Sequence, residues 1–166
     1  MLIQRISRYL IVLSFIIFSI SSCQEDSKML FDQYQETTGT WDKKDVKTFV
    51  YDVQDTVQRH NLFMNLRVNK SYPYSNLFVI FKIHQPNSDI LIDTLQFQMA
   101  KPDGTLLGNS FSDVKESKLE LKEGYVFPEA GSYKFSVEQV VRELGEVEGV
   151  NSLKGVSEVG FRIEKQ

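Results

Sequence analysis

The stretch 62–69, Leu-Phe-Met-Asn-Leu-Arg-Val-Asn, has a large apolar residue at every second position. Successive side chains of a β-strand point to opposite faces, so this period of two predicts a strand that is buried on one face. The next apolar run, 77–83, is Leu-Phe-Val-Ile-Phe-Lys-Ile and predicts a central strand that is buried on both faces. Two neighbouring segments of this kind indicate a β-sheet protein.

Further strand-like segments follow along the chain, at 90–97, 120–127, 132–138 and 156–164. Turns separate them: Lys-Pro-Asp-Gly at 101–104 and Pro-Glu-Ala-Gly at 128–131 each combine a proline that presets φ with a glycine that accepts positive φ. Only 139–148 has an apolar spacing near that of a helix, and a glycine interrupts it, so we expect a helical turn or a loop there. About seven to nine short strands predict an all-β fold, an antiparallel β-sandwich of the Ig-like or jelly-roll-like kind.

The first 22 residues have the pattern of an export signal. Arg5 and Arg8 precede a mostly apolar run at 10–20, which two serines and Cys23 follow. This order is typical of a secretory signal peptide, and an apolar run of about 11 residues falls short of the roughly 20 that span a bilayer. We therefore expect residues 1–22 to be cleaved; an uncleaved N-terminal anchor is the alternative.

Cys23 is the only cysteine, which leaves no intramolecular disulfide. The stretch 20–23, Ile-Ser-Ser-Cys, resembles a bacterial lipobox, in which the cysteine carries diacylglycerol and its amine is acylated. Each buried CH₂ contributes about 0.8 kcal/mol, so two or more chains anchor a protein stably. We expect a lipid on Cys23, a tether at 23–28 and a single domain at 29–166; an ordinary secreted protein with a stray cysteine is the alternative.

Two acidic residues, Glu25 and Asp26, follow Cys23 closely. Such a short charge run is typical of a solvated tether, and it also resembles the surface-export signal of some bacterial lipoproteins. We therefore expect a lipid-anchored protein of the cell envelope that faces the periplasm, with exposure at the cell surface as the alternative.

Composition and motifs argue against several classes of function. Residues 1–22 hold two of the 19 basic residues, so the rest of the chain has 17 basic and 22 acidic residues, a net charge of −5 (17 − 22), which indicates no nucleic-acid partner. His60 and His84 lack the neighbouring ligands that a metal site needs. The stretch 108–112 lacks the second glycine of a nucleophile elbow. We therefore expect no catalytic residue, no metal and no cofactor other than the lipid on Cys23.

The segment Tyr72-Pro73-Tyr74-Ser75-Asn76 lies between two predicted strands. Proline fixes φ and lacks an N–H donor, so the loop is stiff and holds two tyrosine rings near it. Tyrosines on a rigid loop suit partner recognition. The alternative is that both rings pack inward and close the end of the sandwich.

Charged residues of alternating sign fill the C-terminal part of the chain around Gly149, Gly155 and Gly160. They are Arg142, Glu143, Glu146, Glu148, Lys154, Glu158, Arg162, Glu164 and Lys165. Such a pattern indicates either a polar docking face or a solvated edge with weak ion pairs of about 0–1 kcal/mol each.

A lipid-anchored carbohydrate- or peptidoglycan-binding module is a second hypothesis, because sugar rings stack on exposed aromatic side chains. Trp41 is the single tryptophan and the candidate platform, with Tyr34 and Tyr51 as candidate neighbours. The alternative is a tryptophan that packs in the core or at its edge.

Taken together, these segments resemble the gliding motility lipoprotein GldH family of Bacteroidetes. The matching blocks are 65–78, 139–142 and 153–165, in this order behind the lipobox. The resemblance is specific because Tyr-Pro-Tyr-x-Asn-Leu in the first block is joined to Gly-Val-x-x-Val-Gly-x-Arg-Ile-Glu in the last. One departure is Thr-Leu-Leu at 105–107, where the family pattern leads us to expect a tryptophan.

The resemblance implies an outer-membrane-associated lipoprotein that catalyses no reaction and serves as an interaction component of the gliding motility and type IX secretion machinery. The implied partners, besides the membrane, are other gliding or secretion lipoproteins and components of the secretion complex. The candidate partner-binding residues of the loop and the charged segment are Tyr72, Pro73, Tyr74, Asn76, Gln139, Arg142, Arg162 and Glu164.

Overall fold

The structure is a computed structural model that describes residues 27–143, 145–146 and 148–166. The expected signal peptide, Cys23 and most of the tether therefore lie outside the described residues. The strands are β1 (Met29–Glu36), β2 (Thr40–Asp42), β3 (Lys47–Val53), β4 (His60–Asn69), β5 (Asn76–His84), β6 (Ile90–Gln98), β7 (Asn109–Phe111), β8 (Val114–Tyr125), β9 (Gly131–Gln139), β10 (Ser152–Lys154) and β11 (Val156–Lys165). In the described part of the chain, no helix has the length and apolar character needed to cross a membrane.

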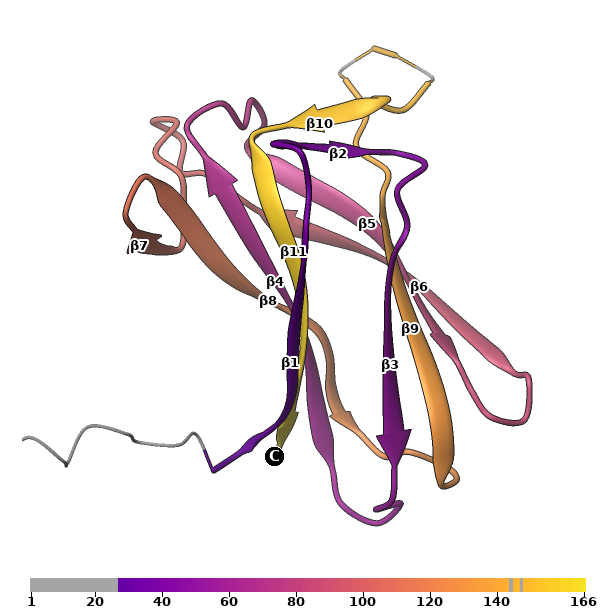
Figure 1. Cartoon of the computed structure of the whole chain (residues 1–166). Helices are drawn as coiled ribbons and strands as arrows, with labels where there is room; N and C mark the ends of the chain where they lie inside the picture. The colour runs from indigo at the N-terminus through magenta and orange to yellow at the C-terminus, as the bar shows by residue number, and fades with distance from the viewer. Residues whose placement is uncertain (1–26, 144, 147) are drawn as a thin grey trace, which may run out of the picture.

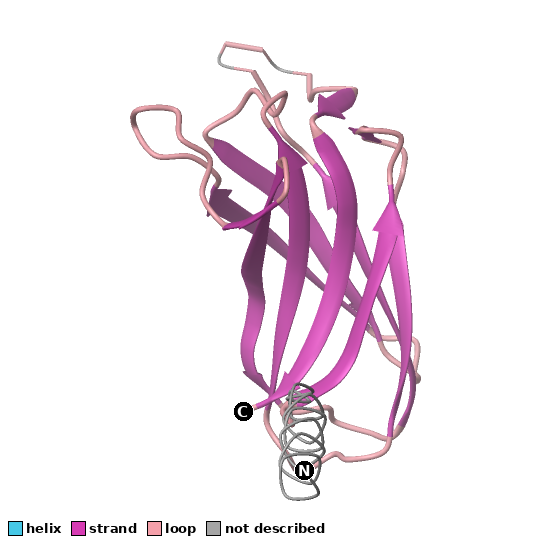
Figure 2. Ribbon diagram, turned by 60° about the vertical axis from the view of Figure 1, so that its left-hand side comes forward, coloured by secondary structure: helices cyan, strands magenta, loops and turns pink. Residues whose placement is uncertain are grey.

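Two antiparallel sheets face each other and enclose the core (Figures 1 and 2). The first has five strands in the order β1-β11-β4-β8-β7, and the second has four in the order β3-β9-β5-β6. β10 and β2 pair at one end of the molecule, at the top of Figure 1, and the connecting loops gather at the two ends. The predicted antiparallel β-sandwich is confirmed.

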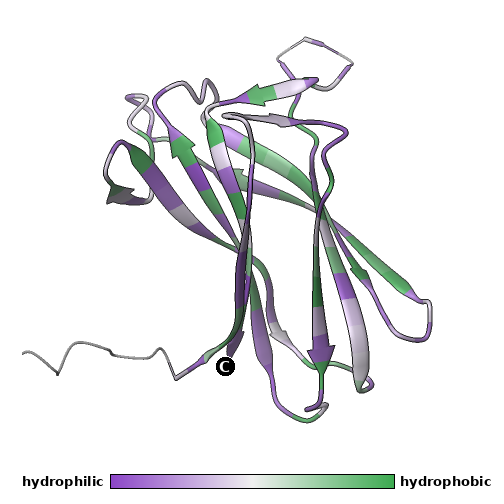
Figure 3. Cartoon of the chain, in the orientation of Figure 1, coloured by the Kyte–Doolittle hydropathy of each residue, from purple (hydrophilic) through white to green (hydrophobic). Residues whose placement is uncertain are grey.

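β4 follows the alternating pattern from which the sheet was predicted. Leu62, Met64, Leu66 and Val68 are each 0% exposed and point into the core. The residues between them point to the outer face of the five-stranded sheet, and Figure 3 shows apolar and polar bands in turn along β4. The period of two therefore also sets which side chains a partner can reach.

β5 lies between β9 and β6, as predicted for a central strand. The prediction that both of its faces are buried is wrong: Leu77, Val79, Phe81 and Ile83 are buried, whereas the residues between them are partly exposed. The reason is that no other element of the described chain packs on the outer face of this sheet. The apolar residues at the alternate positions of β5 therefore face solvent.

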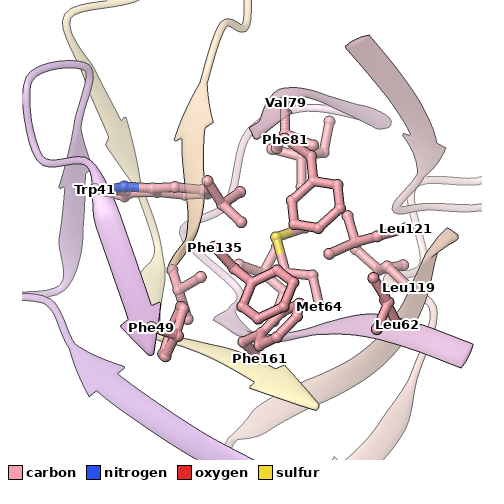
Figure 4. Packing of buried hydrophobic residues seen from close by; sticks show 14 of the residues in the cluster. Trp41, Phe49, Leu62, Met64, Val79, Phe81, Leu119, Leu121, Phe135 and Phe161 are labelled. Carbon is pink, nitrogen blue, oxygen red and sulfur yellow. The ribbon is translucent and has the colours of Figure 1, made fainter. Parts of the chain in front are cut away.

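Phe161 of β11 lies between the two sheets at the centre of the core (Figure 4). Its ring stacks on Phe135 of β9 with the ring centroids 4.5 Å apart, and it contacts Phe49 and Phe81 at 5.7 and 6.0 Å. All four rings are at most 1% exposed. Burial of a phenylalanine side chain contributes roughly 1.5–3 kcal/mol, so this cluster holds the two sheets together.

The segment 139–148, expected to form a helical turn or a loop, contains no helix among its described residues. β9 ends at Gln139, and the chain then forms a loop in which Arg142 makes an isolated antiparallel bridge with Gly149. Gly145 has a φ of +90°, a conformation that side chains with a Cβ atom rarely adopt. This glycine therefore ends the apolar spacing that suggested a helix.

Candidate interaction surface

The outer face of the five-stranded sheet carries charged and aromatic side chains in three rows that cross β1, β11, β4 and β8. The rows are Asp32-Arg162-Phe63-Glu120, Tyr34-Gly160-Asn65-Lys118 and Glu36-Glu158-Arg67-Glu116. Cross-strand neighbours have Cβ atoms about 4.5–5.5 Å apart, so the side chains within a row can contact each other. Together with Glu164, which follows on the same side of β11, we call these residues the charged sheet face.

Arg67 is held between two carboxylates of neighbouring strands. Its Nε lies 2.5 Å from Oε2 of Glu116 on β8, and its Nη1 lies 2.6 Å from Oε2 of Glu158 on β11. The guanidinium also lies 4.4 Å from the centroid of the Tyr34 ring, a cation–π contact. The hydrogen bond to Glu116 raises the pKa of Arg67 above its ordinary value. This charge therefore has a fixed position in the middle of the sheet.

Arg162 and Glu164 form a second ion-pair chain on the same face. Arg162 Nη1 lies 2.9 Å from Oδ2 of Asp32, and its Nε lies 2.5 Å from Oε1 of Glu164. Lys118 Nζ reaches the same Glu164 oxygen at 2.6 Å. Burial alone would raise the pKa of Glu164, but the hydrogen bonds from Lys118 and Arg162 outweigh it and lower the pKa. Both predicted residues of this segment are therefore parts of one network.

Gly160 makes room for an aromatic ring between these two chains. A Cβ atom at this position would lie 2.8 Å from Cδ1 of Tyr34, so only a glycine lets the ring lie against β11. Asn65, 3% exposed, donates through Nδ2 to the hydroxyl of Tyr34 at 2.9 Å and to Oδ1 of Asp32 at 3.3 Å. Tyr34 thus connects the two rows: its ring lies under Arg67, and its hydroxyl shares Asn65 with Asp32, the ion-pair partner of Arg162.

The charged sheet face has an excess of negative charge. Its cations are Arg67, Lys118 and Arg162, and its carboxylates are Asp32, Glu36, Glu116, Glu120, Glu158 and Glu164, which gives a net charge of −3 (3 − 6). Phe111 of β7 borders it, 67% exposed and with its ring centroid 5.7 Å from the guanidinium of Arg67. Aromatic side chains and arginine are enriched in protein interfaces, and Phe111 and Arg67 lie side by side at this border.

The loop 72–76 lies at the end of the sandwich that β10 and β2 close (Figure 1). Tyr72 is 5% exposed, and its hydroxyl donates to the backbone oxygen of Asn76 at 2.8 Å. Tyr74 is partly exposed; its ring meets that of Tyr72 edge-on at 6.1 Å, and its hydroxyl donates to Oε1 of Glu143 at 3.1 Å. The Tyr72 ring therefore packs inward, as the alternative predicts, whereas the Tyr74 ring stays partly accessible and partner binding through it remains a prediction.

Gly155 brings the last matching block of the sequence against this loop. Its φ is +80°, and a Cβ atom there would lie 2.3 Å from the backbone nitrogen of Tyr72. The carbonyl of Gly155 accepts from the backbone N–H of Asn69 at 2.8 Å. The close packing of the blocks around positions 72 and 155 therefore requires a glycine at 155.

A profile of the GldH lipoprotein family matches residues 29–163 of the chain. The chain belongs to the GldH lipoprotein family. It is 48% identical over 141 residues to the gliding motility lipoprotein GldH of Flavobacterium johnsoniae, covering 85% of this chain and 87% of that protein. It is 45% identical over 151 residues to a GldH homolog of Christiangramia forsetii, covering 91% of each. The predicted resemblance is confirmed.

The solved structures that match the fold have low sequence identity and low structural similarity to this chain. A subviral particle of the VP2 protein of infectious bursal disease virus has 9% identity and a TM-score of 0.36, covering 81% of this chain and 30% of that one. A CocE/NonD family hydrolase from Staphylococcus aureus has 12% identity and a TM-score of 0.37, covering 84% and 33%. Likeness at this level supports no inference about the function of this chain.

The candidate residues of this member of the GldH lipoprotein family fall into two separate groups. Arg162 and Glu164 belong to the charged sheet face, whereas Tyr72, Pro73, Tyr74, Asn76, Gln139 and Arg142 lie at the end closed by β10 and β2. Gln139 is 0% exposed: its Nε2 donates to the backbone oxygen of Val150 at 2.9 Å, and its Oε1 accepts from the N–H of Val141 at 3.1 Å. Its side chain positions the following loop and cannot contact a partner at the surface.

Sequence reasoning did not select the centre of the charged sheet face. The sequence indicates Tyr34 only as a candidate neighbour of Trp41, and Asn65 and Arg67 only as part of the matching block 65–78. A signal was present, because Asn65 and Arg67 occupy the polar positions of the alternating stretch 62–69. A polar side chain in the middle of a central strand needs a partner, and the neighbouring strands of the sheet supply it.

Trp41 does not form a platform for sugars. It is 0% exposed, and its Nε1 donates to the backbone oxygen of Asp45 at 2.8 Å. Tyr34 lies under the guanidinium of Arg67, and Tyr51 is half-buried beside Phe31, with the ring centroids 5.6 Å apart. Trp41 is therefore a core tryptophan, as the alternative predicts, and the carbohydrate-binding hypothesis is without its candidate platform.

The two histidines occupy different environments. His60 is 2% exposed beside Phe127, with ring centroids 5.0 Å apart, and burial lowers its pKa. His84, at the end of β5, is partly exposed, and burial and the charges of Lys134 and Lys82 lower its pKa. Among the residues that the structure describes, no three His, Cys, Asp or Glu side chains are grouped so that they could hold a metal ion.

Proposed function

We propose that this GldH family lipoprotein is anchored in the outer membrane by a lipid on Cys23 and acts there, without catalysing a reaction, as an interaction component of the gliding motility and type IX secretion machinery. Membership of the GldH family and the names of its two relatives support the gliding role. We place the domain at the periplasmic face. Its partners are other lipoproteins or components of the same machinery.

The lipid anchor holds the domain close to the membrane. Residues 24–28 separate Cys23 from the first strand residue, Met29, and five residues span at most about 18 Å. Confinement to a thin layer raises the effective concentration of an anchored protein toward membrane partners. Modest contacts through the charged sheet face are then sufficient for association.

The network on the charged sheet face is the observation that supports an interaction role most directly. Ion pairs at 2.5–2.9 Å fix Arg67 and Arg162 in place, and the surface they form has a net charge of −3 with Phe111 at its border. Complementary charge speeds encounter and selects the partner. We therefore expect the partner to present basic residues around an apolar pocket for Phe111.

Charge reversal on this face tests the proposal. Glu36 and Glu120 are exposed members of the face, and no ion pair to either is found in the described chain. Replacement of the native gene by one encoding Glu36→Lys and Glu120→Lys should reduce colony spreading and secretion of type IX cargo, because a basic partner is then repelled. Asp52→Lys, which makes the charge change of one of these two substitutions at an exposed position of β3 on the other sheet, is the control.

Equal protein levels in the envelope, measured by immunoblot, show that the variants fold. Wild-type spreading and secretion in the Glu36→Lys, Glu120→Lys strain would contradict a docking role for the face. A Cys23→Ala strain tests the anchor separately: we expect loss from the membrane fraction together with loss of spreading. A protein that stays in the membrane fraction and supports spreading without Cys23 would contradict the proposed anchor.

A further inference from the structure

β6 is the last strand of the four-stranded sheet, and among the residues that the structure describes no strand pairs with its outer edge. It is nine residues long, contains neither glycine nor proline, and pairs with β5 without a register shift. Ile90, Leu91 and Ile92 at its start are 50%, 37% and 60% exposed. A long, regular, apolar edge of this kind is a template on which another strand can add.

The other edges of the sandwich are protected. β1 and β3 lie beside each other and exchange hydrogen bonds: Gln35 Nε2 donates to the Thr48 oxygen at 2.6 Å, and Lys47 Nζ donates to the Glu36 oxygen at 2.9 Å. β7 is only three residues long. The part of β8 beyond it carries four charged side chains, and charges on an edge strand discourage strand addition. These are Lys118, Glu120, Lys122 and Glu123.

The side of the sandwich next to β6 is open toward β8. One ion pair spans it, with Lys122 Nζ 2.9 Å from Oδ2 of Asp93. Leu95 and Phe97 of β6 are only partly buried at the margin of the core. A strand added to β6 would place every second side chain over these residues and extend the core.

We propose that the free edge of β6 binds an extended segment of a different protein as an additional strand. The edge also specifies the charge of that segment. The only charge on β6, Asp93, is already paired with Lys122, and the outward residues of the strand are uncharged. These are Ile90, Ile92, Thr94, Gln96 and Gln98. The incoming segment is therefore uncharged over about nine residues, with apolar side chains at alternate positions.

The orientation of the domain selects another protein rather than a second copy. β6 starts at the end of the sandwich where β1 also starts, the end nearest the tether (Figure 1). Two copies that paired antiparallel through β6 would be turned end for end, so their tethers would leave at opposite ends. Both could not be anchored in one membrane. This step alone rests on the lipid anchor of the proposed function; the strand-binding edge does not.

The experiment uses the full lipidated chain in detergent micelles and two fluorescent nine-residue peptides, one alternating Thr and Val and one alternating Thr and Lys. We expect the Thr-Val peptide to bind and the Thr-Lys peptide not to bind, by fluorescence anisotropy. Hydrogen exchange should show new protection of residues 90–98. Ile92→Lys should weaken binding by about tenfold or more, since Lys on an edge strand opposes pairing. Val50→Lys, at a 55% exposed position of the edge strand β3, should leave binding unchanged.

Failure of the wild-type chain to bind the Thr-Val peptide, equal affinity of Ile92→Lys and wild type, or protection on another strand would overturn the proposal. A dimer of the wild-type chain that Ile92→Lys dissolves would overturn the choice of partner. The peptide assay does not depend on the membrane: a Cys23→Ala chain that binds the peptide but supports no spreading leaves β6 as a strand-binding edge. A Cys23→Ala chain that supports spreading would remove the proposed anchor without touching β6.

Discussion

The ring of Tyr34 lies against the backbone of Gly160, where a Cβ atom would come within 2.8 Å of the ring and 3.2 Å of Cβ of Asn65. The absence of a Cβ atom at this residue therefore decides whether the tyrosine can link the two ion-pair chains. Its φ is not in the left-handed region, so the requirement for glycine is one of space and not of backbone conformation.

Gly160→Ala should accordingly lower the free energy of unfolding by about 1–3 kcal/mol, the usual cost of overpacking. The measurement is urea unfolding of the full chain followed by circular dichroism. In a Tyr34→Ala background the added methyl group meets no ring, so the second substitution should cost much less. The same cost in both backgrounds would show that the clash is not with Tyr34.

His60 is the second residue whose environment leads to a prediction. Its Nδ1 and the hydroxyl of Tyr125 are buried with no hydrogen-bond partner in the described structure. Burial lowers the pKa of His60; hydrogen bonding to the backbone at Tyr125 and the charge of Asp55 raise it, and the charge of Lys165 lowers it. The folded protein therefore favours the neutral imidazole.

The free energy of unfolding should decrease as the pH drops below about 6.5, the pKa of histidine in an unfolded chain. At such pH the unfolded state binds the proton more tightly than the folded state does. His60→Leu should reduce the difference between urea midpoints at about pH 7.5 and about pH 5.5, whereas His84→Gln should retain most of it. The pKa of Glu164 is lowered by its hydrogen bonds to Lys118 and Arg162, so this carboxylate is protonated only in more acidic solution. An unchanged difference in His60→Leu would exclude His60 as its source.

At the scale of elements, the long strands agree closely with the sequence periods. The stretches 90–97, 132–138 and 156–164 correspond to β6, β9 and β11, each within one residue at either end. β8 begins at Val114 rather than at 120; its first half was not predicted because 115–118 are four consecutive polar residues, without a period of two. β2, β7 and β10 have three residues each, which is too short for a period of two to be recognised.

The sheet edges are the elements at which local sequence and neighbourhood disagree most. The start of β6 is more apolar than β8, yet it is the more exposed of the two, since β8 pairs with β4 and β7 and β6 pairs only with β5. Apolar content alone therefore does not predict burial of a strand. The place of the strand in the sheet decides it.

At the scale of the whole molecule, stability depends on the contact of two sheets through one aromatic cluster. Phe161→Ala should lower the free energy of unfolding by about 3–5 kcal/mol, a large part of the roughly 5–15 kcal/mol that a domain has. Phe111→Ala, at a position 67% exposed, is the control and should change stability little. Thermal unfolding of the full chain measures both, and similar losses in the two variants would contradict a central role for Phe161.

The alternation of apolar and polar residues by itself determined that the chain forms an antiparallel sandwich and which side chains of its long strands point inward, because a period of two is a local property. Only the tertiary structure decided that Asp32, Arg67, Glu116 and Glu158 share one face. The order β1-β11-β4-β8 places segments from both ends of the sequence side by side. Arg67 and Glu158 are 91 residues apart, and the spacing of residues along a strand does not specify which strand will lie next to it.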